Sequence, residues 1–231
     1  MIVSINQPAY LPWLGYFGRI EASDVHVVLD HVQFEKNSFV NRNRVRTADG
    51  ATWLTVPVRT AGRFGISIRE LEIADERWRR KHWATIEQSY RSSPYFDALR
   101  PFLSQVYARE WPRLLELTGV LTTWQLEQLG ITTRIVSSSE LEPAGRKSAL
   151  VLDLCRKLGA TTYLSGPLGR NYLREELFTD AGIEIVYDDF AHPTYPQRFE
   201  PFIPAMAALD LLFNCGPASR EVLVRGKGAI A

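Results

Sequence analysis

Short apolar runs alternate with segments of helical periodicity along much of the chain. A β-branched run at 2–6 precedes a helix-compatible segment at 14–22 and a second apolar run at 25–30. This succession predicts two parallel strands joined by a right-handed helical crossover. Gln7 and Asp30 would then lie at one carboxyl edge of a sheet, which is where open α/β folds bind ligands.

The next part of the chain has the alternation of a β-hairpin. Two β-rich runs, 39–47 and 52–58, flank the turn dipeptide Asp49-Gly50, which is a strong hairpin signal. Pro57 removes a backbone donor near the end of the second run, so we expect an edge strand there. We interpret the hairpin as an insertion on the sheet and 66–73 as a further short strand.

Apolar residues take helical spacing across 76–130. Trp83, Ile86 and Tyr90 share one helix face, and a longer amphipathic run begins at Leu114. Three prolines divide the stretch: Pro94, Pro101 and Pro112. We therefore expect about three helices that form a lobe over an edge of the sheet.

Strand and helix patterns alternate again in the second half of the chain. Strands are predicted at 133–136, 161–165 and 183–187, with a helix at 147–158 that ends at Gly159. Together with the first unit, these segments predict a Rossmann-like α/β fold with a mostly parallel sheet of about five strands.

The whole chain is expected to form a single domain. Its 231 residues suffice for one sizeable core but leave little for two independent ones. In this interpretation, residues 1–75 and 131–231 form the α/β core with its β-hairpin insertion, and residues 76–130 form the helical lobe.

The composition is that of an ordinary globular protein. Hydrophobic residues make up 45% and charged residues 23%, and 27 Lys and Arg balance 26 Asp and Glu. The near-neutral charge argues against a nucleic-acid partner. No apolar run approaches the ~18 residues of a membrane span, and the N-terminus lacks a leader pattern. We expect a cytoplasmic protein with no membrane partner.

The two cysteines, Cys155 and Cys215, cannot build a disulfide framework or a thiolate zinc cluster. Cys155 lies in an apolar run and is interpreted as a small buried hydrophobe. Cys215 follows a helical pattern beside a glycine, so a nucleophilic role remains an alternative. The four histidines are scattered without metal-ligand spacing, and we predict no metal site.

The loop after the first strand is the first candidate site. Gln7, Tyr10, Trp13 and Tyr16 are spread through a Pro- and aromatic-rich segment that leads into a helix. Free backbone N–H groups at such a helix start favour a phosphate or carboxylate. The alternative is that the aromatic rings only pack the helix on the sheet.

Polar residues after the second strand form the next candidates. Asp30 is placed to orient a ribose, accept a proton or hold Mg²⁺, with Gln33 close behind. Along the hairpin, Asn41 would face the opposite side from Arg42 and Arg44. Two guanidinium groups on one face suit an anionic substrate, although a solvated edge strand explains the same pattern.

Two histidines are predicted as general acid/base groups. His192 is preferred, because it lies in a stiff loop with Tyr195 and Gln197. His82 begins a helix on which Tyr90 follows two turns later, close to the same face. A lone helical histidine is more often structural, so His82 ranks second.

A second anion cradle is predicted where the strand at 161–165 ends. Ser165 and Gly166 precede a turn that contains Tyr172, and backbone N–H groups there would face the same sheet edge. A plain turn is the alternative. Ser165 lacks the G-x-S-x-G elbow of a hydrolase nucleophile.

Segments spread over nearly the whole chain resemble the WbqC-like family. These segments are 7–17, 23–24, 30–33, 41–44, 81–83, 90, 94–96, 163–166, 172, 192–197 and 209–214. The resemblance implies a context in surface-polysaccharide or specialised-metabolite biosynthesis. The 7–16 loop also resembles that of nucleotidylyltransferases, but Trp13 and Tyr16 stand where their HxGH-like motif has histidines, which argues against adenylyl transfer by that route.

We therefore expect a small-molecule transferase on a nucleotidylyltransferase-like scaffold, with acyl or aminoacyl transfer favoured over nucleotidyl transfer. Acyl transfer is favoured because it needs only an oriented amine, a base such as His192 or His82 and an oxyanion-stabilising site. The substrate would be nucleotide-linked or carrier-linked. Two alternatives stay open: a non-catalytic ligand-binding protein, and a hydrolase or thioester-handling enzyme that uses Cys215. The sequence names no cofactor and no oligomeric state.

Overall fold

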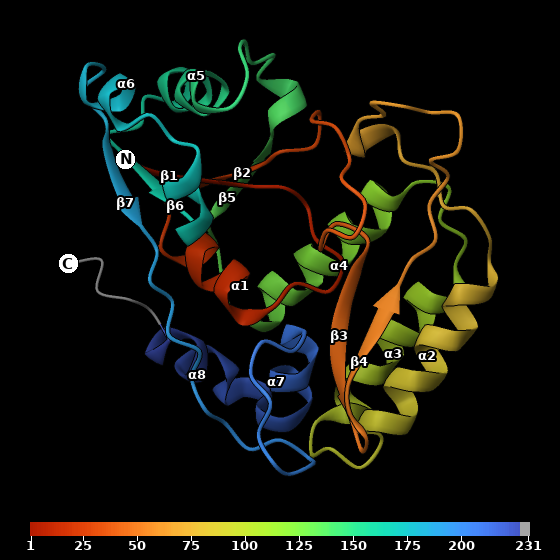
Figure 1. The fold of residues 1–231 in the computed structure, drawn as a ribbon. Helices are drawn as coiled ribbons and strands as arrows, with labels where there is room; N and C mark the ends of the chain where they lie inside the picture. Colours follow the sequence, from red (N-terminus) through yellow and green to blue (C-terminus); the bar gives the residue numbers. More distant parts are fainter. Residues whose placement is uncertain (227–231) are drawn as a thin grey trace.

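The computed structural model describes residues 1–226, and a five-stranded parallel sheet lies in the left part of the view in Figure 1, with the hairpin and the helical lobe on the right. The sheet order is β5-β2-β1-β6-β7. The strands are β1 (Ile2–Asn6), β2 (Val25–Val28), β5 (Arg134–Ser137), β6 (Thr162–Ser165) and β7 (Glu184–Tyr187). Val3 on β1 pairs with Val25 on one side and with Tyr163 on the other. The predicted parallel α/β sheet is confirmed.

Helices cover both faces of this sheet (Figure 1). The helices α5 (Ser148–Leu158) and α6 (Glu175–Thr179) enclose one core with the sheet, whereas α1 (Leu14–Glu21) and α8 (Ser219–Arg225) lie on the other side. Gly159 ends α5 with a left-handed φ of 70°, as the sequence predicts. Because it lacks a Cβ, glycine adopts this conformation without strain.

The hairpin forms a separate two-stranded sheet of β3 (Arg42–Thr47) and β4 (Gly50–Thr55), as predicted. The expected strand at 66–73 is wrong for most of its length, because its centre is the 3-10 helix η1 (Ile68–Glu70). Ile68 and Leu71 are both fully buried, and their spacing of three matches the repeat of that helix.

The helical lobe consists of the three expected helices, α2 (Arg77–Tyr90), α3 (Phe96–Ala108) and α4 (Leu114–Gln128). Pro101 does not divide the lobe, because it lies inside α3, where it removes one backbone hydrogen bond without ending the helix. Two short 3-10 helices, η2 (Ser138–Glu140) and η3 (Pro167–Asn171), follow β5 and β6.

The last elements of the described residues are α7 (Ala208–Cys215), the 3-10 helix η4 (Gly216–Ala218) and α8. Figure 1 shows α7 and α8 beneath α1, beside the hairpin. A segment without helix or strand, 188–207, connects β7 to α7. Within residues 1–226, none of the helices combines the length and apolar character needed to cross a membrane.

Candidate functional site

A buried arginine joins the carboxyl ends of the sheet strands. Arg19 of α1 donates from Nε to Asp188 after β7 at 3.2 Å and from Nη1 to Asn6 at the end of β1 at 2.6 Å. A Cβ on Gly166 would lie 2.9 Å from Nη2, so the turn after β6 rests on the same guanidinium. We call Asn6, Arg19, Gly166 and Asp188 the Arg19 cluster.

The Arg19 cluster holds a buried charge pair. Burial raises the pKa of Asp188, and the nearby Arg19 guanidinium acts in the opposite direction. A pair of this kind costs several kcal/mol to break, because one uncompensated charge would stay buried. The cluster therefore fixes the end of β1 and the turns after β6 and β7 relative to α1.

Aromatic side chains lie beside α1 and surround His192. The Trp13 ring stacks on the imidazole with centroids 6.3 Å apart and planes 11° apart, and Phe190 meets Trp13 edge-on at 5.6 Å. The rings of Tyr195 and Phe202 also pack beside the imidazole, with centroids 6.1 and 5.9 Å from the imidazole centroid. We call these five residues the His192 box.

Two glycines of α1 make room for the box. A Cβ on Gly15 would lie 2.3 Å from the Trp13 ring, and a Cβ on Gly18 would lie 2.7 Å from the Phe190 ring. Both rings therefore lie directly on the helix backbone. The close contact explains why glycine occupies these positions despite its cost of about 1 kcal/mol in a helix.

The hydrogen bonding of His192 defines its tautomer. Nδ1 lies 3.0 Å from the carbonyl oxygen of Pro193, which can only accept, so Nδ1 carries the proton. Nε2 is buried and has no hydrogen-bond partner among the described residues. Burial lowers the pKa of His192, which leaves the ring neutral at pH 7 with a free lone pair. This is the protonation state of a general base.

A fully buried carboxylate, Asp210 on α7, holds the segment that carries His192. Tyr195 donates its hydroxyl to Oδ2 at 2.8 Å, and Gln197 donates its amide to the same oxygen at 2.7 Å. Tyr90 lies close to Asp210, and its hydroxyl accepts from the backbone of Arg46 at 2.9 Å. Oδ1 of Asp210 is buried and has no hydrogen-bond partner among the described residues. Burial raises the pKa of Asp210 against these hydrogen bonds. We call this set the Asp210 network.

Comparison with known proteins identifies the family. The model of the WbqC-like protein family matches residues 7–222, which is nearly the whole chain. The chain belongs to the WbqC-like protein family. A relative from Mycobacterium tuberculosis (strain ATCC 25618 / H37Rv), "Uncharacterized protein Rv1507c", is 36% identical over 223 residues, which are 96% of each chain. No solved structure matches.

Family membership supports the biosynthetic context that the resemblance implies, and it assigns no reaction. The matched region contains the whole His192 box, the Asp210 network and every member of the Arg19 cluster except Asn6. In this WbqC-like protein, the remaining predicted residues are distributed among other parts of the fold.

His82 makes structural hydrogen bonds in this WbqC-like protein. Its Nδ1 lies 2.8 Å from the Tyr10 hydroxyl, which also meets the Tyr107 hydroxyl at 2.7 Å. Burial lowers the pKa of His82 to about 4, although a hydrogen bond with the Thr55 backbone acts against the shift. The contacts join the 7–16 loop to α2 and α3. The predicted catalytic role of His82 stays a prediction.

Asp30 is enclosed by the turn after β5. Ser138 donates to Oδ1 at 2.8 Å, and Ser139 donates from its backbone to Oδ1 at 2.9 Å and from its hydroxyl to Oδ2 at 2.6 Å. Burial raises the pKa of Asp30, but the bonds from Ser139 and Ser138 outweigh it, so the net shift is downward. Because both oxygens of the ionised carboxylate accept hydrogen bonds from Ser138 and Ser139, Asp30 stabilises the end of β2 against the turn after β5.

The hairpin residues divide between its two faces as predicted. Asn41 is buried and donates to the Val56 carbonyl at 2.8 Å. Arg42 and Arg44 face outward over the Trp53 ring, at 4.6 and 5.6 Å from its centroid. These residues belong to the hairpin rather than to the His192 box or the Arg19 cluster.

Four predicted binding residues make fewer contacts. Gln7 is partly buried just beyond β1, and Gln33 is exposed, with its backbone bridged to Ser67. Tyr16 is buried edge-on against His26, with ring centroids 5.6 Å apart. Tyr172 is exposed near the Ser165 turn. Their roles stay predictions.

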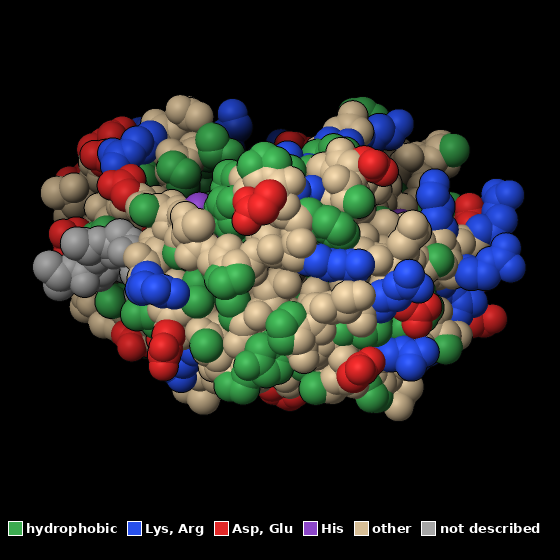
Figure 2. All heavy atoms as spheres, turned by 90° about the horizontal axis from the view of Figure 1, so that it is seen from below, with side chains coloured by type: hydrophobic (Ala, Val, Ile, Leu, Met, Phe, Trp, Pro, Cys, Tyr) green, Lys and Arg blue, Asp and Glu red, His purple; other side chains and the backbone are tan. Residues whose placement is uncertain are grey.

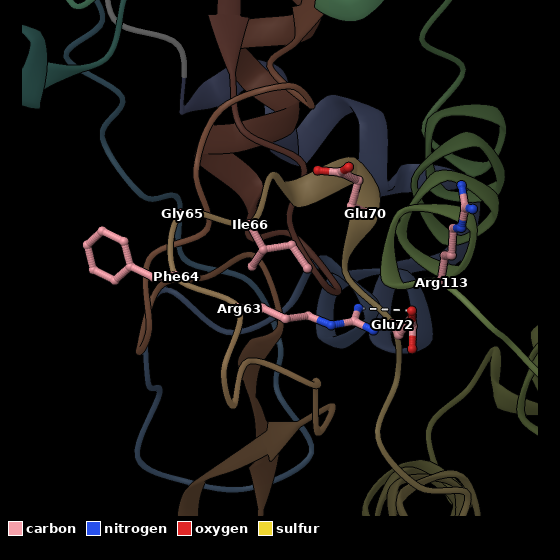
Figure 3. Close-up of a pocket in the computed structure, with 7 residues that line it drawn as sticks. All are labelled: Arg63, Phe64, Gly65, Ile66, Glu70, Glu72 and Arg113. Atoms are coloured by element: carbon pink, nitrogen blue, oxygen red, sulfur yellow. Dashed lines mark hydrogen bonds and ion pairs between the residues drawn. The ribbon is translucent and has the colours of Figure 1, made fainter.

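A surface hollow of about 490 Å³ lies near η1 (Figure 3). Arg63 forms an ion pair with Glu72 at 2.9 Å, and Glu70 accepts a hydrogen bond from the Ser67 hydroxyl. Phe64 points away from the hollow in Figure 3. Among the residues that the structure describes, no three His, Cys, Asp or Glu side chains gather as metal ligands. The expectation of no metal stays a prediction.

The sequence did not single out Arg19 or Asp210. Each is a charged residue inside an otherwise apolar helical stretch, in Gly15-Tyr-Phe-Gly-Arg19-Ile20 and in Leu209-Asp-Leu-Leu-Phe213. Charged residues are rarely buried unless they are paired. An isolated charge on the apolar face of a predicted helix is the signal that would have found them.

Proposed function

We propose that this WbqC-like protein is a transferase that moves an acyl or aminoacyl group onto an amine in surface-glycan or specialised-metabolite biosynthesis. The donor is a nucleotide-linked or carrier-linked substrate. The observation that carries the proposal is His192, a neutral imidazole whose buried Nε2 has no partner among the described residues.

The reaction needs few groups. The amine nitrogen of the acceptor attacks the acyl carbon of the donor, so that the new C–N bond forms while the bond from carbon to the leaving thiol or hydroxyl breaks. Nε2 of His192 accepts the proton that the amine loses, and the imidazolium returns a proton to the leaving group. Both proton transfers use one nitrogen, so the reaction balances without a further reactant.

The position of His192 supports this use. The Arg19 cluster lies at the carboxyl ends of β1, β6 and β7, where open α/β sheets bind ligands. Trp13, which stacks on His192, follows directly in the loop after β1. A substrate held at these strand ends would lie beside the loop whose Trp13 ring stacks on the imidazole.

A two-stage experiment tests the proposal. First, a thermal-shift screen with nucleotides, nucleotide sugars and acyl-coenzyme A compounds selects the ligand class, because a native-state ligand must raise the melting temperature. Second, product formation with the selected donor and amino-sugar acceptors is followed by mass spectrometry. We expect His192→Ala to lower the rate 100-fold or more. His31→Ala, a change at a histidine that bonds Ser138 and lies outside the His192 box, should keep it. Normal turnover by His192→Ala would overturn the assignment.

A specific observation favours a second candidate, a ligand-binding protein without catalysis. Asp30 and His82, two of the predicted catalytic groups, already bond to protein partners. In that case the same screen would find a stabilising ligand, and neither the native protein nor His192→Ala would form product.

The alternative that uses Cys215 receives less support. Burial and the neighbouring Asp210 raise the pKa of this thiol, whereas nucleophilic cysteines have a lowered pKa. Cys215→Ser combined with iodoacetamide treatment separates the mechanisms: a variant without turnover, together with inactivation of the native protein by iodoacetamide, would restore the thiol mechanism, whereas normal turnover by Cys215→Ser would exclude it.

A further inference from the structure

A groove of about 480 Å³ runs between β4 and α2. Four consecutive residues of β4, 52–55, line one side, and Trp78, Lys81 and Thr85 of α2 line the other. A wall of consecutive strand residues means that the groove follows the outer edge of β4. Within residues 1–226 the hairpin sheet consists of β3 and β4, so no strand of the described part of the chain lies beside this edge at 51–55.

The register shows which backbone groups face the groove. Val56 donates its N–H to the Asn41 carbonyl at 2.8 Å, and in the same register Asn43 is opposite Leu54. Along an antiparallel strand, residues whose backbone groups bond the paired strand alternate with residues whose N–H and C=O groups point to the opposite side. The even-numbered residues of β4 therefore bond β3, and Ala51 and Trp53 direct their N–H and C=O groups outward.

The two edges of the hairpin differ. On β3, the outward N–H of Arg46 donates to the Tyr90 hydroxyl at 2.9 Å, and the outward carbonyl of Arg44 accepts from Ala207 at 2.8 Å. On β4, within residues 1–226, no hydrogen bond reaches the outward groups of Ala51 or Trp53. The edge of β4 is thus open at Ala51 and Trp53, whereas the next outward residue, Thr55, already bonds His82 through its backbone.

The same edge already pairs with another segment of the chain a few residues further on. Arg59 donates to the Glu72 carbonyl at 2.9 Å, and Ala74 donates to the Pro57 carbonyl at 2.8 Å. The added segment leaves the edge at Asp75, which lines the groove. The groove is therefore the next position along an edge that already accepts a strand.

Exposed aromatic and cationic side chains surround the open edge. Trp53 and Phe39 are 45% and 52% exposed, with ring centroids 5.9 Å apart. Arg42 and Arg44 stack on Trp53, and Lys81 is exposed in the groove. Figure 2 shows Lys and Arg side chains gathered at the end of the molecule where α2 and α3 lie. Tryptophan and arginine are the residues that most often dominate binding at protein interfaces.

We propose that the open edge of β4 binds an extended, acidic segment of a partner protein as an added strand. Its main chain would pair with Ala51 and Trp53, and its carboxylates would meet Lys81 and the outward arginines. Self-pairing of two β4 edges is disfavoured, because it would bring the cations of both copies together. The site goes beyond the proposed transfer reaction and does not depend on it.

Synthetic peptides test the site on the intact protein. The probe is a capped heptapeptide of alternating glutamate and valine, with a lysine-valine peptide and a fully N-methylated glutamate-valine peptide for comparison. NMR of isotope-labelled protein reports the backbone amides. We expect the glutamate-valine peptide to shift the signals of Ala51 and Trp53, and each comparison peptide to bind at least tenfold more weakly.

Two variants at one position sharpen the test. Ala51→Pro removes an outward N–H that is not part of the ladder with β3, so the hairpin should persist while binding falls at least tenfold. Ala51→Ser keeps the N–H and should bind as the native protein does. Equal binding of the N-methylated peptide, absence of binding, or a dimer that Ala51→Pro dissociates would each overturn the proposal.

Discussion

Gly15 carries no side chain at the point where the Trp13 ring covers α1, and the same ring stacks on His192. One missing Cβ thus determines where the imidazole's aromatic neighbour lies. The sequence indicated the 7–16 loop as a site, but spacing along the chain cannot show that a ring folds back over a helix backbone.

Gly15→Ala should displace Trp13, because the new Cβ would lie 2.3 Å from the ring. We expect the transfer rate, or the affinity for the ligand found by thermal shift, to fall about tenfold, which corresponds to about 1.4 kcal/mol. Gly119→Ala is the matched control: it lies in α4, its Cβ would meet nothing within 4 Å, and it should stabilise slightly. An unchanged rate in Gly15→Ala would contradict the role of Trp13.

His26 should make the protein acid-sensitive. It is fully buried on β2, and burial lowers its pKa from 6.5 to about 3. Between these pH values the unfolded chain binds a proton that the folded chain does not, so stability falls as the pH falls. The slope is about 1.4 kcal/mol per pH unit.

Urea unfolding between pH 4 and pH 6 measures this contribution. His26→Asn keeps a donor and acceptor near Ser4, whose hydroxyl lies 2.8 Å from Nδ1 of His26. The pH slope of this variant should be smaller than that of the native protein by about 1.4 kcal/mol per unit. Identical slopes would show that His26 is protonated in the fold.

At the scale of elements, the segment 188–207 takes its position from α7 rather than from any regular structure of its own. Tyr195 and Gln197 both bond Asp210 on that helix, and His192 lies just before them. The stiff loop could be predicted from its prolines, but its anchor could not, because Asp210 is fifteen residues away from Tyr195 and looks like an ordinary helical carboxylate.

Tyr195→Phe removes one donor from the buried Asp210. We expect the free energy of unfolding to fall by about 1–3 kcal/mol, the cost of leaving a buried polar group short of a partner. Tyr187→Phe is the control, because the Tyr187 hydroxyl donates to the exposed Glu175 at 2.7 Å, and its loss should cost less than about 0.5 kcal/mol. Chemical denaturation compares the two, and equal losses would argue against the Asp210 network as an anchor.

Sequence patterns predict best the elements in which buried residues recur at the regular spacing of a strand or a helix. The parallel strands appear in the sequence as short apolar runs, because helices cover both faces of the sheet. In the three lobe helices, the apolar residues recur at helical spacing and mark the buried face. The segment 66–73 was mistaken for a strand, because Ile66, Ile68 and Ile73 are β-branched while burial at Ile68 and Leu71 follows a period of three.

For the molecule as a whole, two apolar clusters show how its parts are connected. One lies between the sheet and the α5 and α6 side. The other extends without a break from α1 through the hairpin and the helical lobe to α7. The predicted division at 76–130 is thus a change of secondary structure, and the lobe shares its core with the rest of the fold.

Unfolding should therefore be cooperative. Leu121 of α4 is fully buried in the larger cluster, and Leu121→Ala should cost about 2–5 kcal/mol. Far-ultraviolet and near-ultraviolet circular dichroism should report one shared, lowered midpoint. Two separate transitions would show that the lobe melts alone.

The central place of β1 has a consequence for the time course of folding. Its partner on one side, β2, lies close by in the chain, whereas Tyr163 of β6 is 160 positions beyond Val3. Contacts between distant positions form slowly, because a long loop must close before they stabilise the chain. During synthesis, β1 leaves the ribosome before β6, and α2, α3 and α4 are made between them. One edge of β1 therefore stays unpaired until β6 has been synthesised. During that interval the nascent chain exposes the apolar edge that a chaperone would need to shield.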